Sequence, residues 1–120
     1  MIRIQSLNNS NQFQEILKKK KLNNNYFTIY FGKSILDKKN NSKNLNISFV
    51  IKKKIGGSVK RNKIRRKLKS AVQRILESDD TVNLNYTYVI FGKERVYSEK
   101  FSAIFNETAE IFNKIKKLNH

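Results

Sequence analysis

Basic side chains are concentrated between Lys52 and Arg74, where 11 of 23 residues are Lys or Arg and none is acidic. Gly56-Gly57 interrupts this run, and an amphipathic helix is predicted to begin near Asn62. Glycines ahead of a helix let backbone N–H groups approach a phosphate closely, and the helix dipole adds partial positive charge at the same point. The stretch therefore predicts a binding site for a polyanion with regularly spaced phosphates.

The predicted helix has three distinct sides when its residues are placed about 100° apart. One side is apolar and is expected to pack on a core, and it comprises Ile64, Leu68, Ala71, Val72 and Ile75. The second side carries Asn62, Arg66, Lys69 and Gln73, with Arg65 on its border, and the third carries Lys63, Lys67 and Arg74. A basic helix face is usually only solvated. So many like charges without an acid repel one another in the free protein, which favours a polyanionic partner.

The segment from Lys53 to Lys69, KKIGGSVKRNKIRRKLK, resembles the signature of the bacterial ribonuclease P protein component. That signature reads Lys, hydrophobic, Gly, any, Ala, Val, any, Arg, Asn, any, any, basic, Arg, two residues, basic. Its Arg-Asn-x-x-basic-Arg core is intact from Arg61 to Arg66. Ser58 stands where Ala is usual, Lys69 where Arg is common and Ser70 where Glu is common. These departures keep or increase the positive charge.

The resemblance implies a subunit that binds the catalytic RNA subunit of ribonuclease P and the 5′ leader of precursor tRNA, and that assists endonucleolytic removal of this leader. The expected contacts to the RNA subunit are Lys53, Lys54, Lys60, Arg61, Asn62, Lys63, Arg65, Arg66 and Lys69. An aromatic-lined cleft between the first helix and the sheet is expected to receive the leader at Phe13, Leu17 and Tyr30, and Leu17 departs from the usual aromatic residue. In this family the RNA performs a Mg²⁺-dependent hydrolysis. The resemblance thus implies no catalytic residue and no metal site in this chain, and one protein per RNA.

Three of these features also have plainer interpretations. Asn62 lies where the helix is predicted to begin, so its amide can cap the helix instead of contacting RNA. Tyr30 is expected on the open face of a strand, where a tyrosine is more often ordinary surface than a stacking platform for a base. Lys18–Lys21 fits a solvated helix end as well as an RNA contact.

Length and composition limit the function classes. The chain has 120 residues and a net charge of +17, which indicates one domain and a partner such as nucleic acid or an anionic membrane surface. A hydrophobic content of 38% with 8 Phe and 5 Tyr is too high for a disordered basic tail. The sequence has no cysteine, no signal-peptide pattern and no apolar run long enough to span a membrane, so a cytoplasmic location is expected.

The residues for protein-based catalysis are scarce. The only histidine is His120 at the last position, and Asp79-Asp80 is the only adjacent pair among nine acids. General acid–base chemistry needs a histidine or a tuned carboxylate, and a two-metal site needs several ligands. The polypeptide is therefore predicted to be non-catalytic.

Hydrophobic periodicity predicts the elements that position these residues. A first helix is expected with Ser10 as N-cap, with Phe13, Ile16 and Leu17 on one face and Lys18–Lys21 at its end, followed by a turn at 23–25. Strands are expected at 26–31, from 45 or 46 to 51, and at 85–91, with a polar loop at 32–46. In the first strand Phe27, Ile29 and Phe31 should face the core while Tyr26, Thr28 and Tyr30 face outward. Exposed turn residues are expected at 77–80, and Ser98 is expected to cap a final helix.

The order is a helix, two or three strands, a helix, a strand and a helix. It predicts an α+β sandwich of the α-β-β-β-α-β-α type, like the second domain of ribosomal protein S5, in one RNA-binding domain over residues 1–120. The strand–helix–strand unit over 46–91 should contain a parallel pair, whose crossover is ordinarily right-handed. The family resemblance instead implies a left-handed crossover, in which the basic helix forms the connection between the two strands. Two other classes share the composition: a ribosomal or ribosome-assembly protein, which would lack the Arg-Asn-x-x-basic-Arg core, and a peripheral membrane or nucleoid-coating protein, which would need bulky apolar residues opposite its lysines.

Overall fold

The computed structural model describes residues 2–7, 9–33, 44–78 and 82–118. Its elements are β1 (Arg3–Gln5), α1 (Ser10–Ile16), β2 (Lys20–Asn23), β3 (Phe27–Gly32), β4 (Asn44–Val50), the 3₁₀ turn η1 (Lys53–Ile55), α2 (Ser58–Ser78), β5 (Thr87–Gly92), the 3₁₀ turn η2 (Glu94–Tyr97) and α3 (Phe101–Leu118). The predicted α-β-β-β-α-β-α order is confirmed, with β2 as the strand to which the sequence assigned no residues. The short strand β1, ahead of α1, is an addition to it.

The sheet has five strands in the order β1-β4-β5-β3-β2. Central β5 pairs parallel with β4 and antiparallel with β3, so the predicted parallel pair flanking α2 is confirmed. Strand β1 adds to β4 in parallel, and β2 forms the opposite edge against β3. The basic helix α2 therefore connects two adjacent strands at the middle of the sheet.

The main core lies between one face of this sheet and the helices α2 and α3. The strand register places Ile29 beside Ile90 on this face, and both side chains are fully buried. All five residues of the predicted apolar side of α2 are buried as well. A Cβ on Gly92 would lie 2.5 Å from the Cδ1 of Ile51 and 2.8 Å from the Cδ1 of Leu68, so a larger residue would displace these buried methyl groups.

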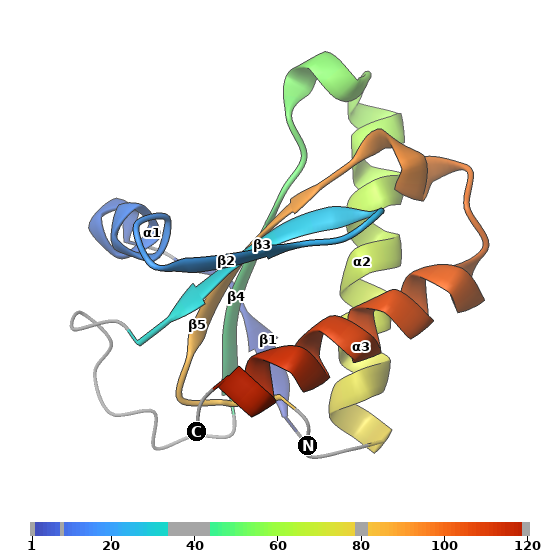
Figure 1. Cartoon of the computed structure of the whole chain (residues 1–120). Helices are drawn as coiled ribbons and strands as arrows, with labels where there is room; N and C mark the ends of the chain where they lie inside the picture. The colour runs from blue at the N-terminus through green and yellow to red at the C-terminus, as the bar shows by residue number, and fades with distance from the viewer. Residues whose placement is uncertain (1, 8, 34–43, 79–81, 119–120) are drawn as a thin grey trace.

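Helix α1 packs on the opposite face, against β3 and β5. In Figure 1 it lies across the sheet from α2 and α3. Ile16 of α1 and Val89 of β5 are fully buried, yet they lie outside the main core cluster. The outward face of the sheet thus has a small core of its own, and α1 covers only part of that face.

The predicted start and end of the first helix are wrong. Asn9, not Ser10, is the N-cap, and its Oδ1 accepts hydrogen bonds from the backbone N–H groups of Asn11 at 2.8 Å and Gln12 at 3.4 Å. The helix ends at Ile16, and Lys20 and Lys21 belong to strand β2 instead of a helix end. Pairing with β3 outweighs the low strand propensity of this lysine-rich segment.

The predicted beginnings of the two long helices are also wrong. Helix α2 starts at Ser58, four residues before Asn62, so Asn62 lies inside the helix and does not cap it. Helix α3 starts at Phe101, and the carbonyl of Lys100 accepts the first helical hydrogen bonds. Ser98 instead ends the turn η2.

Three further predictions need correction or fall outside the described residues. Tyr26 is buried instead of facing outward, because β3 begins one residue later and strand alternation does not reach it. Glu77, which was predicted in an exposed turn after the helix, belongs to the C-terminal end of α2 itself. Residues 79–80 of that predicted turn lie outside the described residues. Most of the predicted 32–46 loop is likewise not described; Gly32 ends β3, and β4 begins at Asn44.

Candidate nucleic-acid interface

The turn before α2 presents backbone and cations together. Lys53 and Lys54 lie in η1 and are exposed, and Gly56 and Gly57 connect η1 to the first residue of α2. A Cβ on Gly57 would meet no atom within 4 Å, so the backbone at the helix start is open. The first N–H groups of a helix have no intrahelical partner and favour an anion. This turn can therefore bind a phosphate without rearrangement.

The outer side of α2, which we define as Asn62, Arg65, Arg66 and Lys69, points away from the core. Arg65 Nη1 donates to Asn62 Oδ1 at 2.7 Å, which holds that guanidinium along the helix surface. Among the described residues no ion pair joins this side to a carboxylate. Its charges are therefore available to a partner outside the chain.

Arg61 is held at the junction between the turn and the helix. Its Nε donates to the carbonyl oxygen of Gly56 at 3.1 Å, and its backbone N–H donates to that of Gly57 at 3.0 Å. The remaining guanidinium nitrogens extend the donors of the turn. Arg61 thus connects the turn to the outer side.

The inner side of α2, which we define as Lys60, Lys63, Lys67 and Arg74, faces η2 and α3 instead. The ammonium groups of Lys60 and Lys63 lie 5.1 and 4.9 Å from the ring centre of Tyr97. Lys60 also forms a 2.6 Å ion pair with Glu94, whose pKa is lowered by the hydrogen bond and the charge of Lys60. These cations are engaged within the protein.

Lys67 is the most strongly engaged cation of the inner side. Its Nζ donates to the carbonyl oxygens of Val96 at 3.1 Å, Tyr97 at 2.9 Å and Glu99 at 3.0 Å. Burial and the neighbouring charge of Lys63 lower the pKa of Lys67 from its ordinary value of 10.5, and the charge of Glu99 opposes this shift. Lys67 therefore fixes η2 and Glu99, which follows it, onto α2.

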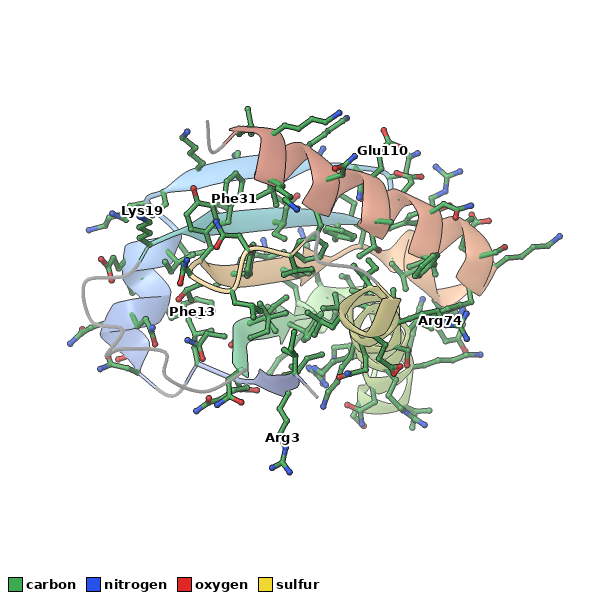
Figure 2. The ribbon with its side chains drawn as sticks, turned by 90° about the horizontal axis from the view of Figure 1, so that it is seen from below. Arg3, Phe13, Lys19, Phe31, Arg74 and Glu110 are labelled. Carbon is green, nitrogen blue, oxygen red and sulfur yellow. The ribbon has the colours of Figure 1, made fainter. Side chains whose placement is uncertain are left out.

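Farther along the inner side, the guanidinium of Arg74 lies 5.1 Å from the ring centre of Phe101 (Figure 2). Phe101 itself stacks on Phe105, with ring centres 6.3 Å apart. This contact extends the attachment of α2 to the start of α3.

An aromatic cluster of Phe13, Tyr30 and Phe91 occupies the face of the sheet that α1 partly covers. The Phe91 ring lies 6.4 Å from that of Phe13 and 5.7 Å from that of Tyr30, so Phe91 is the central ring. All three side chains are half-buried. Half-exposed rings at this spacing can stack on or enclose unpaired bases.

Two lysines flank the aromatic cluster. The ammonium of Lys52 lies 5.8 Å from the ring centre of Phe91, and that of Lys21 lies 5.9 Å from that of Tyr30. Lys52 directly precedes η1, so it connects the cluster to the cations at the start of α2. An RNA strand on the cluster would meet positive charge at both ends.

The structure brings two of the three predicted cleft residues together. Phe13 and Tyr30 meet through Phe91, while Leu17 lies one turn beyond Phe13 at the end of α1 and is half-buried. Sequence reasoning missed Phe91 and Lys52 at this cluster, and it left Lys21 open between a solvated helix end and an RNA contact. The alternation of residues in the last strand could have indicated Phe91. Phe91 lies on the same face of β5 as Val89, opposite to the face of Tyr88 and Ile90.

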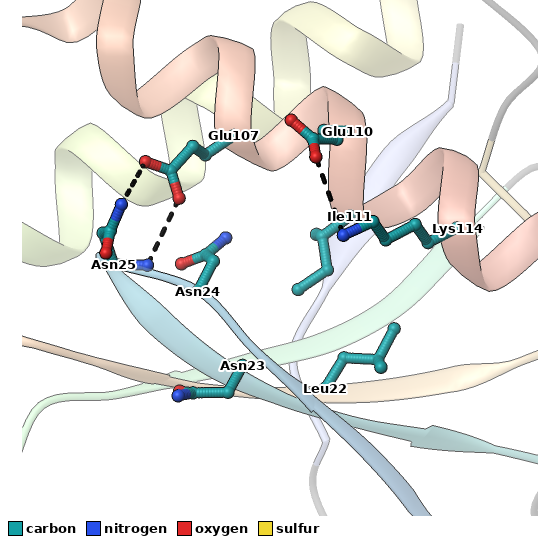
Figure 3. A pocket seen from close by; sticks show the side chains of 8 residues that line it. All are labelled: Leu22, Asn23, Asn24, Asn25, Glu107, Glu110, Ile111 and Lys114. Atoms are coloured by element: carbon teal, nitrogen blue, oxygen red, sulfur yellow. Dashed lines mark hydrogen bonds and ion pairs between the residues drawn. The ribbon is translucent and has the colours of Figure 1, made fainter.

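A hollow on the other side of the sheet has the opposite character (Figure 3). Its volume is about 390 Å³, and it lies between α3 and the turn that joins β2 to β3. Glu107 accepts hydrogen bonds from the Asn25 backbone at 3.2 Å and from the Asn25 amide at 3.0 Å, and Glu110 pairs with Lys114 at 3.6 Å. Carboxylates repel phosphates, so this hollow is poorly suited to an RNA backbone.

Within the described parts of the chain, no three His, Cys, Asp or Glu side chains are grouped so that they could hold a metal ion. No described helix is both long and apolar enough to cross a membrane.

Comparisons with known proteins agree on one family. The family model described as Ribonuclease P matches residues 1–116. A ribonuclease P protein component of Mesomycoplasma hyopneumoniae (strain 7448) is 28% identical over 118 residues, which cover 98% of this chain and 97% of that protein. One from Carboxydothermus hydrogenoformans is 33% identical over 92 residues, 77% of this chain and 73% of the other. The fold matches the RNase P protein from Thermotoga maritima with a TM-score of 0.72 at 19% identity, over 92% of this chain and 96% of that one.

Proposed function

The chain belongs to the ribonuclease P protein family, and on this basis we propose that it is the protein subunit of a ribonuclease P holoenzyme, the endoribonuclease that matures the 5′ ends of tRNAs. It binds the RNA subunit of that enzyme through the turn at Gly56-Gly57 and the outer side of α2. It binds the 5′ leader of precursor tRNA on the aromatic cluster.

The observation that carries this proposal is the outer side of α2. Asn62, Arg65, Arg66 and Lys69 lie beside a helix start with open backbone, and no described carboxylate pairs with them. Guanidinium groups bind phosphates in a fork that lysine does not offer, and each phosphate neutralised releases counterions. This arrangement suits the backbone of a folded RNA. Lys53, Lys54 and Arg61 add contacts around it. Lys60 and Lys63 of the inner side are held by Tyr97 and contribute their positive charge beside this surface.

The division of labour that we propose for the holoenzyme is the one that the family resemblance implies. The protein lowers the repulsion between two RNAs and holds the leader, while the RNA subunit performs hydrolysis with Mg²⁺. No residue of this chain acts in the chemical step, and one protein acts per RNA. We place this assembly in the cytoplasm, away from a membrane.

Reconstitution tests the proposal directly. The protein is mixed with an RNA subunit transcribed in vitro and a precursor tRNA, and the cleaved 5′ leader is measured at low Mg²⁺ with and without protein. We expect leader release to depend on the protein. A protein that neither binds the RNA subunit nor changes leader release would refute the proposal.

The same purified protein and RNAs distinguish ribonuclease P from the two other classes of protein that share its composition. A ribosomal or ribosome-assembly protein would copurify with ribosomal RNA and leave precursor tRNA processing unchanged. A membrane or nucleoid-coating protein would bind anionic vesicles or duplex DNA as strongly as it binds the RNA subunit.

Binding of the leader is tested at Tyr30. Stacking of a base on an aromatic ring contributes about 1–3 kcal/mol, so Tyr30→Ala should weaken the binding of precursor tRNA to the holoenzyme about ten- to hundredfold. Mature tRNA and the RNA subunit should bind the variant and the wild type alike. A uniform loss in all three assays would mean that Tyr30 serves only folding, and an unchanged affinity for precursor tRNA would remove the leader from the aromatic cluster.

A further inference from the structure

A hollow rimmed by lysines lies at the β2 edge of the sheet, outside the surfaces assigned above. Its volume is about 470 Å³, within the range of nucleotide-sized sites. We define this lysine hollow by Lys18, Lys19, Lys20 and Lys33 around Phe31 and Tyr86. In Figure 2, Lys19 marks this edge of the molecule, while Arg3 points away from the opposite edge.

The floor of the hollow is aromatic and its rim is cationic. The rings of Phe31 and Tyr86 lie 5.9 Å apart; Phe31 is almost fully buried, and Tyr86 is half-exposed. All four lysines of the rim are exposed, and no carboxylate lines the hollow among the described residues. An aromatic wall inside a ring of ammonium groups complements a base with its phosphates.

Gly32 shapes one side of this hollow. A Cβ at this position would lie 2.9 Å from both Cβ and Cγ of Lys19, so the stem of Lys19 packs directly across the glycine backbone. The contact falls on the rigid part of the lysine side chain, not on its flexible tip. The Lys19 side chain is therefore held at the rim.

Strand β2 connects the hollow to the aromatic cluster. Lys20 pairs with Phe31 and Lys21 with Tyr30, and successive residues of a strand point to opposite faces. Lys20 therefore lines the hollow, while Lys21 stands over Tyr30 in the cluster. Because β2 is an edge strand, a chain leaving the cluster can pass over it and meet positive charge on both faces.

We propose that the lysine hollow is a second RNA subsite, which binds a leader nucleotide farther from the cleavage site than those on the aromatic cluster. The ammonium groups contact its phosphates, and Tyr86 contacts its base. This subsite rests on the proposed function and extends it. It makes holoenzyme affinity depend on leader length beyond the nucleotides that the cluster holds.

The test uses precursor tRNAs whose leaders are lengthened one nucleotide at a time, with dissociation constants measured for the reconstituted holoenzyme. The variants are Lys20→Gln and, as the matched control, Arg3→Gln, which removes one exposed cation from the opposite edge strand. A third variant, which combines Lys18→Gln with Lys20→Gln, should weaken the binding of long-leader substrates further than Lys20→Gln alone. Thermal unfolding of each free protein verifies that the fold is kept.

We expect Lys20→Gln to weaken binding of long-leader substrates about two- to fivefold, the range of an exposed charge pair, and to leave short-leader substrates unaffected. Removing one ammonium–phosphate interaction should lower the salt slope of log affinity by about 0.7 for long leaders alone. The Arg3→Gln control should match the wild type at every length.

Two results would overturn the subsite. An equal loss at all leader lengths, mature tRNA included, would assign these lysines to the tRNA body or the RNA subunit. No loss at any length would leave the lysine run as solvated surface. Either result is distinct from failure of the proposed function, in which the wild-type protein itself would not support leader release.

Discussion

The two basic sides of α2 have similar composition and different surroundings. The outer side presents Arg65, Arg66 and Lys69 without a carboxylate partner among the described residues. On the inner side, Lys67 donates to three carbonyl oxygens, and Arg74 covers the Phe101 ring. One set of cations is therefore available to RNA, whereas the other fixes the helix to the rest of the protein.

This difference shows that the number of basic residues in a segment overstates the positive charge that is free to bind a partner. Eleven basic residues in one segment indicate a polyanion site, yet part of that charge satisfies backbone carbonyls and aromatic rings within the fold. An ammonium in this role replaces a hydrogen-bonding partner that the carbonyls would otherwise lack. The contrast leads to four predictions, ordered from the largest expected effect to the smallest.

Lys67→Met should destabilise the protein most. The change removes three charge-assisted hydrogen bonds, two of them part-buried, so we expect a loss of about 3 kcal/mol in the free energy of unfolding, measured with urea. The control is Lys69→Met on the outer side, which should change stability by less than about 0.5 kcal/mol. Equal stability losses in the two variants would remove the distinction between the sides.

Arg65→Ala combined with Arg66→Ala should weaken RNA binding instead. Removing two guanidinium–phosphate interactions should reduce RNA-subunit binding by about 2 kcal/mol, roughly thirtyfold, and lower the salt slope by about 1.4–1.8. The unfolding free energy should stay nearly unchanged. Arg74→Ala on the inner side serves as the control, and a slope reduced by Arg74→Ala but not by the double variant would reverse the assignment.

Tyr97→Leu should have a smaller effect on the inner side. It removes the ring under the ammonium groups of Lys60 and Lys63, each contact contributing about 0.5–1 kcal/mol at an exposed site. We expect a stability loss of about 1 kcal/mol in the same urea experiment. Tyr97→Phe keeps the ring and should restore wild-type stability; if it does not, the hydroxyl rather than the ring is important.

Glu94→Gln should have the smallest effect, and that effect should depend on pH. The pKa of Glu94 is lowered from its ordinary value of 4.5 by Lys60, so the pair stabilises the folded state above that value. This stabilisation is lost as the pH falls through the lowered pKa. The wild type and Glu94→Gln should therefore differ slightly in melting temperature at neutral pH and converge in acid; a difference that grows in acid would contradict the pairing.

Strong periodicity made the core of the fold predictable. The apolar side of α2 and the inward residues of β3 were correct because burial imposes a period on long, well-packed elements. Strand β1 was missed and β2 was not located, since both lie at sheet edges and β2 has the sequence Lys-Lys-Leu-Asn. Only their pairing with β4 and β3, which joins residues distant in sequence, makes them strands.

The candidate site was predictable in part. The motif located the outer side of α2, and the resemblance located Phe13 and Tyr30. Alternation indicated the face of Phe91, but the neighbours of Phe91 and Lys52 could not be assigned, because they depend on the register between β3, β5 and β4. The role of Lys67 was equally hidden, since its carbonyl partners follow nearly 30 residues later in the chain.

The central position of β5 has a consequence for synthesis on the ribosome. Before Thr87–Gly92 emerges, β2 can pair only with β3 and β1 only with β4, because neither β3 nor β4 has its second neighbour. Two-stranded pairs are marginal alone, and pairing between distant segments is slow. The nascent chain therefore exposes the whole basic segment and the apolar side of α2 until β5 joins the two halves. A chain that stops short of Thr87 would have no continuous sheet.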